Sequence, residues 1–286
     1  MGGGSYGYAE RMYINSQQYK PSVSREEVFK QSKMHEDMDI KGKIRECRFS
    51  EEHPDAFPII IALDVTGSMG HVPDKLIRTG LPDIMKKILE SGVKDPQVCF
   101  VAIGDQYTDS APIQVGQFES SDELLDKWLK TVWLEGHGGG NGGESYQLVW
   151  QFADHHTDCD WINIRGKKGV IISIGDDAVH KSISSEEIKR LFGKKLQSVT
   201  TSGLLSNIQS CWDVYHITLN DYNGKDKNLQ KQWNDLLGDH HTVTEGGKGD
   251  DIPKIISGMI LESYNRQKSS GETAKTVETE HNEHLL

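Results

Sequence analysis

Three uninterrupted apolar runs constrain the fold of this chain more than any other feature of its sequence. A strand with one face in water alternates apolar and polar residues, whereas a continuous apolar run is typical of a strand that is covered on both faces. We therefore expect buried strands within FPIIIALDV (57–65), QVCFVAIGD (97–105) and GVIISIGDD (169–177).

Segments with helical periodicity separate these strands. Apolar residues recur at helical spacing in 72–92, where Gly92 ends the pattern, and 120–134 opens with a capping serine and an acidic first turn. The segment APIQVGQF (111–118) follows the second run after a short loop and is expected to pair with it as a hairpin. This alternation predicts an α/β fold with a doubly wound, Rossmann-like and mainly parallel sheet that carries helices on both faces. It continues with helices expected in 143–156, 184–192, 204–212, 227–238 and 250–265, and strands in 213–219 and 240–245.

No linker interrupts this pattern, so we expect one domain over residues 51–265. Residues 1–50 are glycine-rich and then charged, and we expect an N-terminal arm that is partly flexible, with a short helix in 24–38 and an edge strand in 42–50. Residues 266–286 are polar and lack aromatic side chains, which predicts a disordered tail.

The net charge disfavours several classes of partner, and the cysteine content argues against a zinc framework and disulfides. The net charge is −11, from 43 acidic against 32 basic side chains, which disfavours nucleic acid and anionic membranes and suits a site for divalent cations. The four cysteines form no C-x-x-C pair, so we expect neither a zinc framework nor disulfides. The start of the sequence has no apolar core of a signal peptide, and no apolar run is long enough to cross a bilayer. These features favour the cytoplasm and no membrane partner.

Polar side chains follow each of the apolar runs, in DVTGS, GDQYTD and GDDAVH, and the glycine-rich HGGGNGGES (137–145) precedes a helix. In open α/β sheets ligands bind at the carboxyl ends of the strands, so Asp64, Asp105, Asp176 and Asp177 are expected to lie close together. Carboxylates in such proximity repel one another unless a positive charge lies between them. Hydroxyl and carboxylate oxygens without Cys or His indicate a magnesium-type site and not a zinc site.

The stretch DVTGSM (64–69) resembles the D-x-[ST]-x-S signature of the von Willebrand factor A (vWA) domain, whose metal-ion-dependent adhesion site is abbreviated MIDAS. Further segments follow in the order of that family. GGGNGGES (138–145) resembles its second metal loop, IISIGDDA (171–178) its third, and 236–259 its closing helix, strand and helix. The resemblance covers Ala56 to Tyr264.

The resemblance implies a Mg²⁺ or Mn²⁺ ion held by the three loops. Thr66 and Ser68 would supply hydroxyl ligands, Asp64 would bind directly or through water, and Asp176 would bind through water. The family's usual second-loop threonine falls on Gly142, so either Asn141 or Ser145 substitutes for it or the metal has fewer protein ligands. The third loop also departs from the family, with Gly175 and Asp177 where it has threonine and glycine. The expected ligands are Asp64, Thr66, Ser68, Asn141 and Asp176, with Asp105, Glu144, Ser145 and Asp177 as supporting residues around them.

The function that the resemblance implies is metal-dependent protein binding and not catalysis. A cation held largely by neutral hydroxyls stays electrophilic, so it attracts a carboxylate from a partner protein. Cytoplasmic members of the family often act as adaptors, and some accompany MoxR-type AAA+ ATPases, which makes such an ATPase a candidate partner.

Two enzymatic alternatives compete with this interpretation. In the first, Ser68 is the nucleophile of a serine hydrolase and HGGG (137–140) supplies the oxyanion hole. However, Thr66 stands at the first glycine of the G-x-S-x-G pattern, and HGGG follows the nucleophile strand where it should precede it. In the second, Asp64 is the nucleophile of a haloacid dehalogenase-like phosphoryl-transfer enzyme, which requires a carboxylate where Thr66 stands.

Overall fold

A six-stranded sheet forms the centre of the protein in the computed structural model, which describes residues 5–67, 69, 71–136, 142–246 and 249–283. The strand order is β10-β9-β6-β2-β3-β4, and all neighbouring pairs are parallel except β3 with β4. The expected mainly parallel sheet and the expected hairpin are confirmed. The strands are β2 (Phe57–Asp64), β3 (Pro96–Ile103), β4 (Ile113–Val115), β6 (Gly169–Gly175), β9 (Trp212–Thr218) and β10 (His241–Val243).

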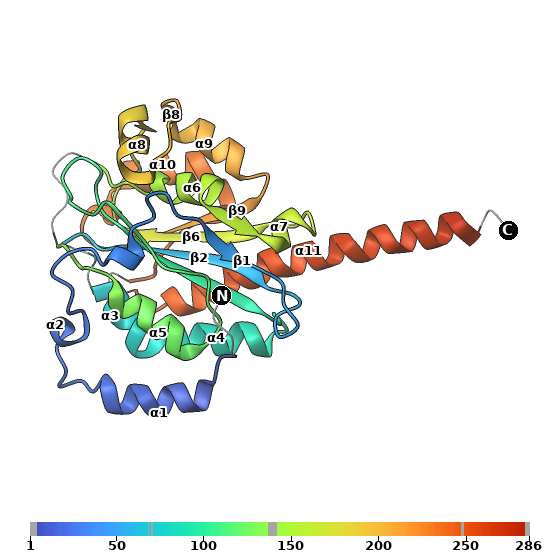
Figure 1. Ribbon diagram of the computed structural model, residues 1–286, viewed down its shortest axis with the longest axis horizontal. Helices are drawn as coiled ribbons and strands as arrows, with labels where there is room; N and C mark the ends of the chain where they lie inside the picture. The colour runs from blue at the N-terminus through green and yellow to red at the C-terminus, as the bar shows by residue number, and fades with distance from the viewer. Residues whose placement is uncertain (1–4, 68, 70, 137–141, 247–248, 284–286) are drawn as a thin grey trace.

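Helices cover both faces of this sheet (Figure 1). Because side chains alternate along a strand, Ile59 and Ile61 of β2 enter one apolar cluster and Ile60 and Ala62 enter the other. The first face carries α3 (His71–Lys75), the π-helical turn η2 (Leu76–Gly80), α4 (Leu81–Glu90), α5 (Asp122–Thr131), α7 (Asp160–Asn163) and the start of α11 (Ile252–Glu283). The second face carries α6 (Gln147–His155), α8 (Ser185–Phe192), α9 (Thr201–Ile208) and α10 (Lys227–Leu237).

Short elements link these layers. The strands β7 (Ser182–Ile183) and β8 (Val199–Thr200) form an antiparallel pair, and two 3₁₀ turns, η3 (Tyr222–Lys225) and η4 (Gly238–His240), flank α10. No helix among the described residues combines the length and the apolar character that crossing a membrane requires.

The N-terminal arm packs on the body of the protein. Its elements are α1 (Tyr8–Gln18), α2 (Arg25–Val28), the 3₁₀ turn η1 (Glu36–Met38) and β1 (Arg45–Cys47). Helix α1 lies outside α4 and α5 as an additional layer (Figure 1). The expected strand in 42–50 exists as β1, but it pairs with β5 (Thr157–Cys159) in a separate two-stranded sheet and does not extend the central one.

Helix α11 begins against the sheet and then projects away from the body (Figure 1). Its first turns pack on the core through Ile256 and Ile260. Arg266 still contacts the body, where its guanidinium pairs with Asp213. The rest of the helix falls in 266–286, and the disorder expected there stays a prediction.

Candidate functional site

The expected metal loops begin at two strands that lie side by side in the middle of the sheet. Asp64 is the last residue of β2, Asp176 follows the last residue of β6, and Leu63 is in register with Ile174. From β2 the chain continues to β3 on one side, and later crosses to β6 on the other. Ligands of open α/β sheets bind at such a reversal of strand order, outside the carboxyl ends of the strands. The topology therefore places the first and third predicted loops where a ligand site is expected.

Asp64 is fully buried, and its carboxylate accepts hydrogen bonds only from neutral groups of the described residues. Its Oδ1 accepts from the Thr66 amide (2.9 Å) and the Thr66 hydroxyl (2.6 Å), and its Oδ2 accepts from the Tyr146 hydroxyl (2.7 Å). The pKa of Asp64 is raised to about 7: burial is the main cause, these hydrogen bonds oppose the rise, and the nearby Asp176 carboxylate adds to it. The ionised form of Asp64 is therefore costly in the absence of a positive charge.

Glu144 adds a second buried carboxylate to this region. Its side chain is 2% exposed, and Oε2 makes no hydrogen bond with any described residue. Burial raises the pKa of Glu144 to about 10, with further contributions from the negative charges of Asp64 and Asp105. The second and third loops are joined here, because the Glu144 amide donates to the Ala178 carbonyl (2.8 Å). Three carboxylates from three loops, those of Asp64, Glu144 and Asp176, thus lie within electrostatic reach of one another.

Other predicted supporting residues have structural tasks in their own loops. The Asp105 carboxylate accepts from His180 Nε2 (2.9 Å) and from the Thr108 hydroxyl (2.9 Å). The Ser145 hydroxyl accepts from the Gln106 amide (2.7 Å), which joins the loop after β3 to the second predicted loop. These bonds fix the positions of the loops around Asp64.

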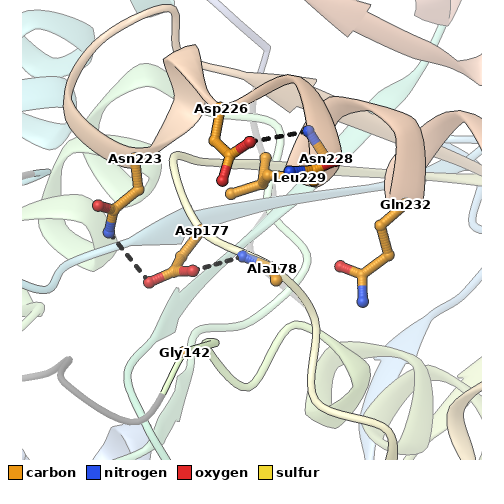
Figure 2. Close-up of a pocket in the computed structure, with 8 residues that line it drawn as sticks. All are labelled: Gly142, Asp177, Ala178, Asn223, Asp226, Asn228, Leu229 and Gln232. Atoms are coloured by element: carbon orange, nitrogen blue, oxygen red, sulfur yellow. Dashed lines mark hydrogen bonds between the residues drawn. The ribbon is translucent and has the colours of Figure 1, made fainter.

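Asp177 is turned toward a neighbouring cavity of about 590 Å³ (Figure 2). Its carboxylate accepts from the Ala178 amide (2.7 Å) and from the Asn223 side chain (3.2 Å). Gly142, which stands at the position of the family's usual threonine, lies at the edge of the same cavity.

Two of the predicted ligands, Ser68 and Asn141, lie outside the described residues. Among the residues that the structure does describe, no group of three or more His, Cys, Asp or Glu side chains is arranged to hold a metal ion. The predicted site would use the hydroxyls of Thr66 and Ser68, which are not among these four residue types. The predicted ligand set therefore stays a prediction.

Tyr146 is the residue of this region that the sequence analysis missed. It is fully buried, its hydroxyl donates to Asp64, and its ring packs edge-on against His216 and Trp233, with centroids 5.1 and 5.3 Å away. A Cβ atom at Gly175 would lie 1.8 Å from the Tyr146 hydroxyl oxygen, so only glycine leaves room for it. The departure from the family pattern at Gly175 was therefore the available signal that a side chain fills this space.

Comparison with known proteins identifies no family. No family model matches the sequence, and no curated protein matches it significantly. Among solved structures, the pilus adhesin SpaC from Lactobacillus rhamnosus GG, in its open conformation, aligns over 77% of this chain and 31% of its own, with 11% identity and a TM-score of 0.49. Proximal thread matrix protein 1 from the mussel byssus aligns over 76% and 49%, with 10% identity and a TM-score of 0.47. The chain spans about a third to a half of these structures, and similarity at this level carries no conclusion about function.

Proposed function

We propose that this chain is a metal-dependent protein-binding domain of the vWA type, with a doubly wound sheet. In this proposal the loops after β2 and β6, together with the glycine-rich loop before α6, hold Mg²⁺ or Mn²⁺. The ion would then bind a carboxylate of a partner protein. The ligands would be Asp64, Thr66, Ser68, Asn141 and Asp176.

The observation that carries the proposal is the contrast between Asp64 and two other buried aspartates, Asp126 and Asp213. Asp126 pairs with Arg11 and Lys130, and Asp213 pairs with Arg266. Removing a carboxylate from water is expensive, and these basic side chains offset the cost. Asp64 is more deeply buried than either, yet from the described part of the chain its carboxylate receives only two hydroxyls and an amide, and its neighbours include further carboxylates. A bound cation would supply the missing positive charge.

The donor chemistry of the region fits a small, hard cation. The Thr66 hydroxyl gives its proton to Asp64, so its oxygen lone pairs are left to accept from elsewhere or to coordinate a metal. The Oε2 of Glu144, which has no hydrogen-bond partner among the residues that the structure describes, is a further buried oxygen that a metal-bound water could satisfy. Oxygen donors of this kind are preferred by Mg²⁺ and Mn²⁺ over zinc.

The family resemblance extends the proposal to partners. An adaptor in the cytoplasm that presents an acid-binding metal to another protein is consistent with the net charge of −11, which disfavours nucleic acid. A MoxR-type AAA+ ATPase is the partner class that the resemblance suggests.

Metal titration tests the first half of this proposal. Isothermal titration calorimetry should show uptake of Mg²⁺ or Mn²⁺ by the wild-type protein and none by Asp64→Ala. Asp239→Ala, which changes an exposed aspartate of η4, serves as the matched control and should bind like the wild type. Absence of uptake by the wild type would refute the metal site.

Partner capture tests the second half. A purified MoxR-type ATPase should bind the immobilised protein in Mg²⁺ and be released by EDTA. Full binding by Asp64→Ala in EDTA would exclude capture through this site. Labelling of Ser68 by a fluorophosphonate would instead favour the serine hydrolase.

A further inference from the structure

The chain after the third metal loop forms an isolated strand-like edge. Val179 forms a parallel bridge with Glu144, in which the Glu144 amide donates to the Ala178 carbonyl (2.8 Å) and the His180 amide donates to the Glu144 carbonyl (3.2 Å). In extended chains successive residues direct their backbone groups to opposite sides. The N–H and C=O of Val179 therefore point away from Glu144, and no described residue hydrogen-bonds to either of them.

The side to which these groups point faces helix α10. The carbonyl of Asp177 accepts from the indole N–H of Trp233 in α10 (3.0 Å), and Val179 lines a cavity together with Asn228 and Gln232 of the same helix. The Val179 side chain is buried in the core on the α6 face of the sheet, so this orientation of the backbone is fixed. An unpaired main-chain edge thus lies opposite a helix.

Two adjoining cavities of about 590 and 600 Å³ occupy the space between this edge and α10, and we call them together the α10 groove. Asn228 and Gln232 of α10 line both cavities. Ala178 lines the first cavity and Val179 the second. Figure 2 shows the first, with Gln232 projecting from α10 on the same side as Ala178.

Gln232 presents a polar atom that also has no partner. Its side-chain Oε1 is buried and makes no hydrogen bond with any described residue. A buried amide oxygen without a donor is unfavourable, and a ligand N–H in the groove would satisfy it. The groove therefore offers one unused N–H and two unused carbonyl oxygens, which match the pattern of a polypeptide backbone.

We propose that the α10 groove binds an extended peptide segment, whose main chain pairs with Val179 and donates to Gln232. This is recognition by addition of a strand to an edge whose main-chain groups make no hydrogen bond with the described residues. Aspartates and lysines both line the groove, among them Asp177, Asp226, Lys181 and Lys231. Such a lining selects neither a polyanion nor a polycation, which favours a peptide over a nucleic acid.

The position of the groove connects it with the metal site. Gly142 of the second predicted loop and Asp177 of the third line its first cavity. A segment bound in the groove would pass beside both loops and could present an acidic side chain to the ion. This part of the inference rests on the proposed function. It takes the segment in the groove to be the stretch of the partner protein that flanks the carboxylate bound by the metal ion.

The test uses a displayed library of random linear dodecapeptides, panned on the full chain in Mg²⁺. Enriched peptides are synthesised and their affinities are measured for the wild type, Gln232→Leu and the control Gln209→Leu, which makes the same change at an exposed residue after α9. Gln232→Leu should weaken binding by about tenfold, as expected for the loss of one hydrogen bond, whereas the control should bind like the wild type. Amide hydrogen exchange at Val179 should slow when the peptide binds.

Two results would overturn the groove: a library that yields no enriched peptide, or peptides that bind Gln232→Leu like the wild type without protecting Val179. Measurements in EDTA and with Asp64→Ala separate the groove from the metal site. Peptides that require Gln232 and are unaffected by EDTA would support the groove and refute acid capture through the metal. Peptides that require metal but not Gln232 would support acid capture through the metal and refute peptide binding in the groove.

Discussion

Replacement of Asp64 by asparagine should stabilise the metal-free protein while it abolishes the response to Mg²⁺. The two side chains have nearly the same shape, and the asparagine carbonyl oxygen can still accept from the amide and hydroxyl of Thr66. The change removes a carboxylate that is fully buried beside other carboxylates. The ionised Asp64 carboxylate should weaken the fold when no cation is bound, and the neutral asparagine amide should not.

The magnitude follows from the pKa of Asp64. Its rise from the ordinary value of 3.8 to about 7 is roughly three units, and at about 1.4 kcal/mol per unit the ionised carboxylate costs about 4 kcal/mol at pH 8. Asparagine turns an N–H₂ group toward the Tyr146 hydroxyl, which changes one hydrogen bond and offsets about 1–1.5 kcal/mol of the gain. We expect a net stabilisation of about 2–3 kcal/mol, which is roughly 5–10 °C in Tm for a domain of this size.

Thermal unfolding in EDTA and in Mg²⁺ measures both halves of this prediction. In EDTA at pH 8 the Asp64→Asn variant should unfold at the higher temperature. In Mg²⁺ at one hundred times its Kd, only the wild type should gain, by about 2.7 kcal/mol. Asp239→Asn, at an exposed position, should follow the wild type in both conditions.

The pH dependence supplies an independent check of the cause. Because the pKa of Asp64 is raised in the folded state, the contribution of this group to the stability of the metal-free wild type is fully present below pH about 4 and is lost as the pH rises through about 7. Because the changed hydrogen bond at Tyr146 still costs about 1–1.5 kcal/mol, the advantage of Asp64→Asn should vanish near pH 5, about one unit above the ordinary pKa, and be complete above pH 7. A variant that is less stable than the wild type in EDTA at pH 8, or that gains equally from Mg²⁺, would refute the reasoning.

Three further predictions concern residues around the site and the arm. Tyr146→Phe removes the hydroxyl that donates to Asp64, so the unfolding free energy should fall by about 1–3 kcal/mol. Calorimetry should also show weaker binding of Mg²⁺. An unchanged affinity for Mg²⁺ would contradict a role of Tyr146 in positioning Asp64. Asp126→Asn leaves the guanidinium of Arg11 buried without its counter-ion, so the unfolding free energy should fall by about 3–5 kcal/mol. Limited proteolysis should then cut the N-terminal arm faster than in the wild type. Cleavage of the arm at the wild-type rate would show that this pair does not hold α1. Burial lowers the pKa of His241 to about 4. The contribution of this histidine to stability should therefore be present above pH 6.5 and be lost as the pH falls through 4. An NMR titration of this imidazole with a midpoint near 6.5 would contradict the effect of burial.

The central sheet could be predicted from the sequence because each strand carries its signal locally. An uninterrupted apolar run is sufficient to identify a strand covered on both faces, and β2, β3 and β6 lie where such runs predict them. Strand alternation also predicts which strand ends share an edge, and the ends of β2 and β6 do lie side by side, whereas the metal site expected there stays a prediction.

Helix α1 could not be predicted in this way because polar side chains attach it to the body. Its buried residues are Arg11 and Asn15. Arg11 pairs with Asp126, and the Asn15 side chain donates to the carbonyl oxygens of Ile77 and Arg78 (3.1 and 2.9 Å). Hydrophobic periodicity does not detect a helix whose inward face is polar.

The electrostatics of the site depend on contacts that no local pattern encodes. The sequence places Asp64 at a strand end, but it does not show that this side chain is fully buried, or that its second oxygen is held by a tyrosine 82 residues away. That contact requires glycine at 175, in a third segment, so three separate parts of the chain determine the environment of one carboxylate. Asp126, by contrast, is paired with the basic side chain of Arg11. The burial of Asp64 among hydroxyls and other acids makes the metal-free fold less stable than it need be, and groups that are unfavourable for folding in this way concentrate at functional sites.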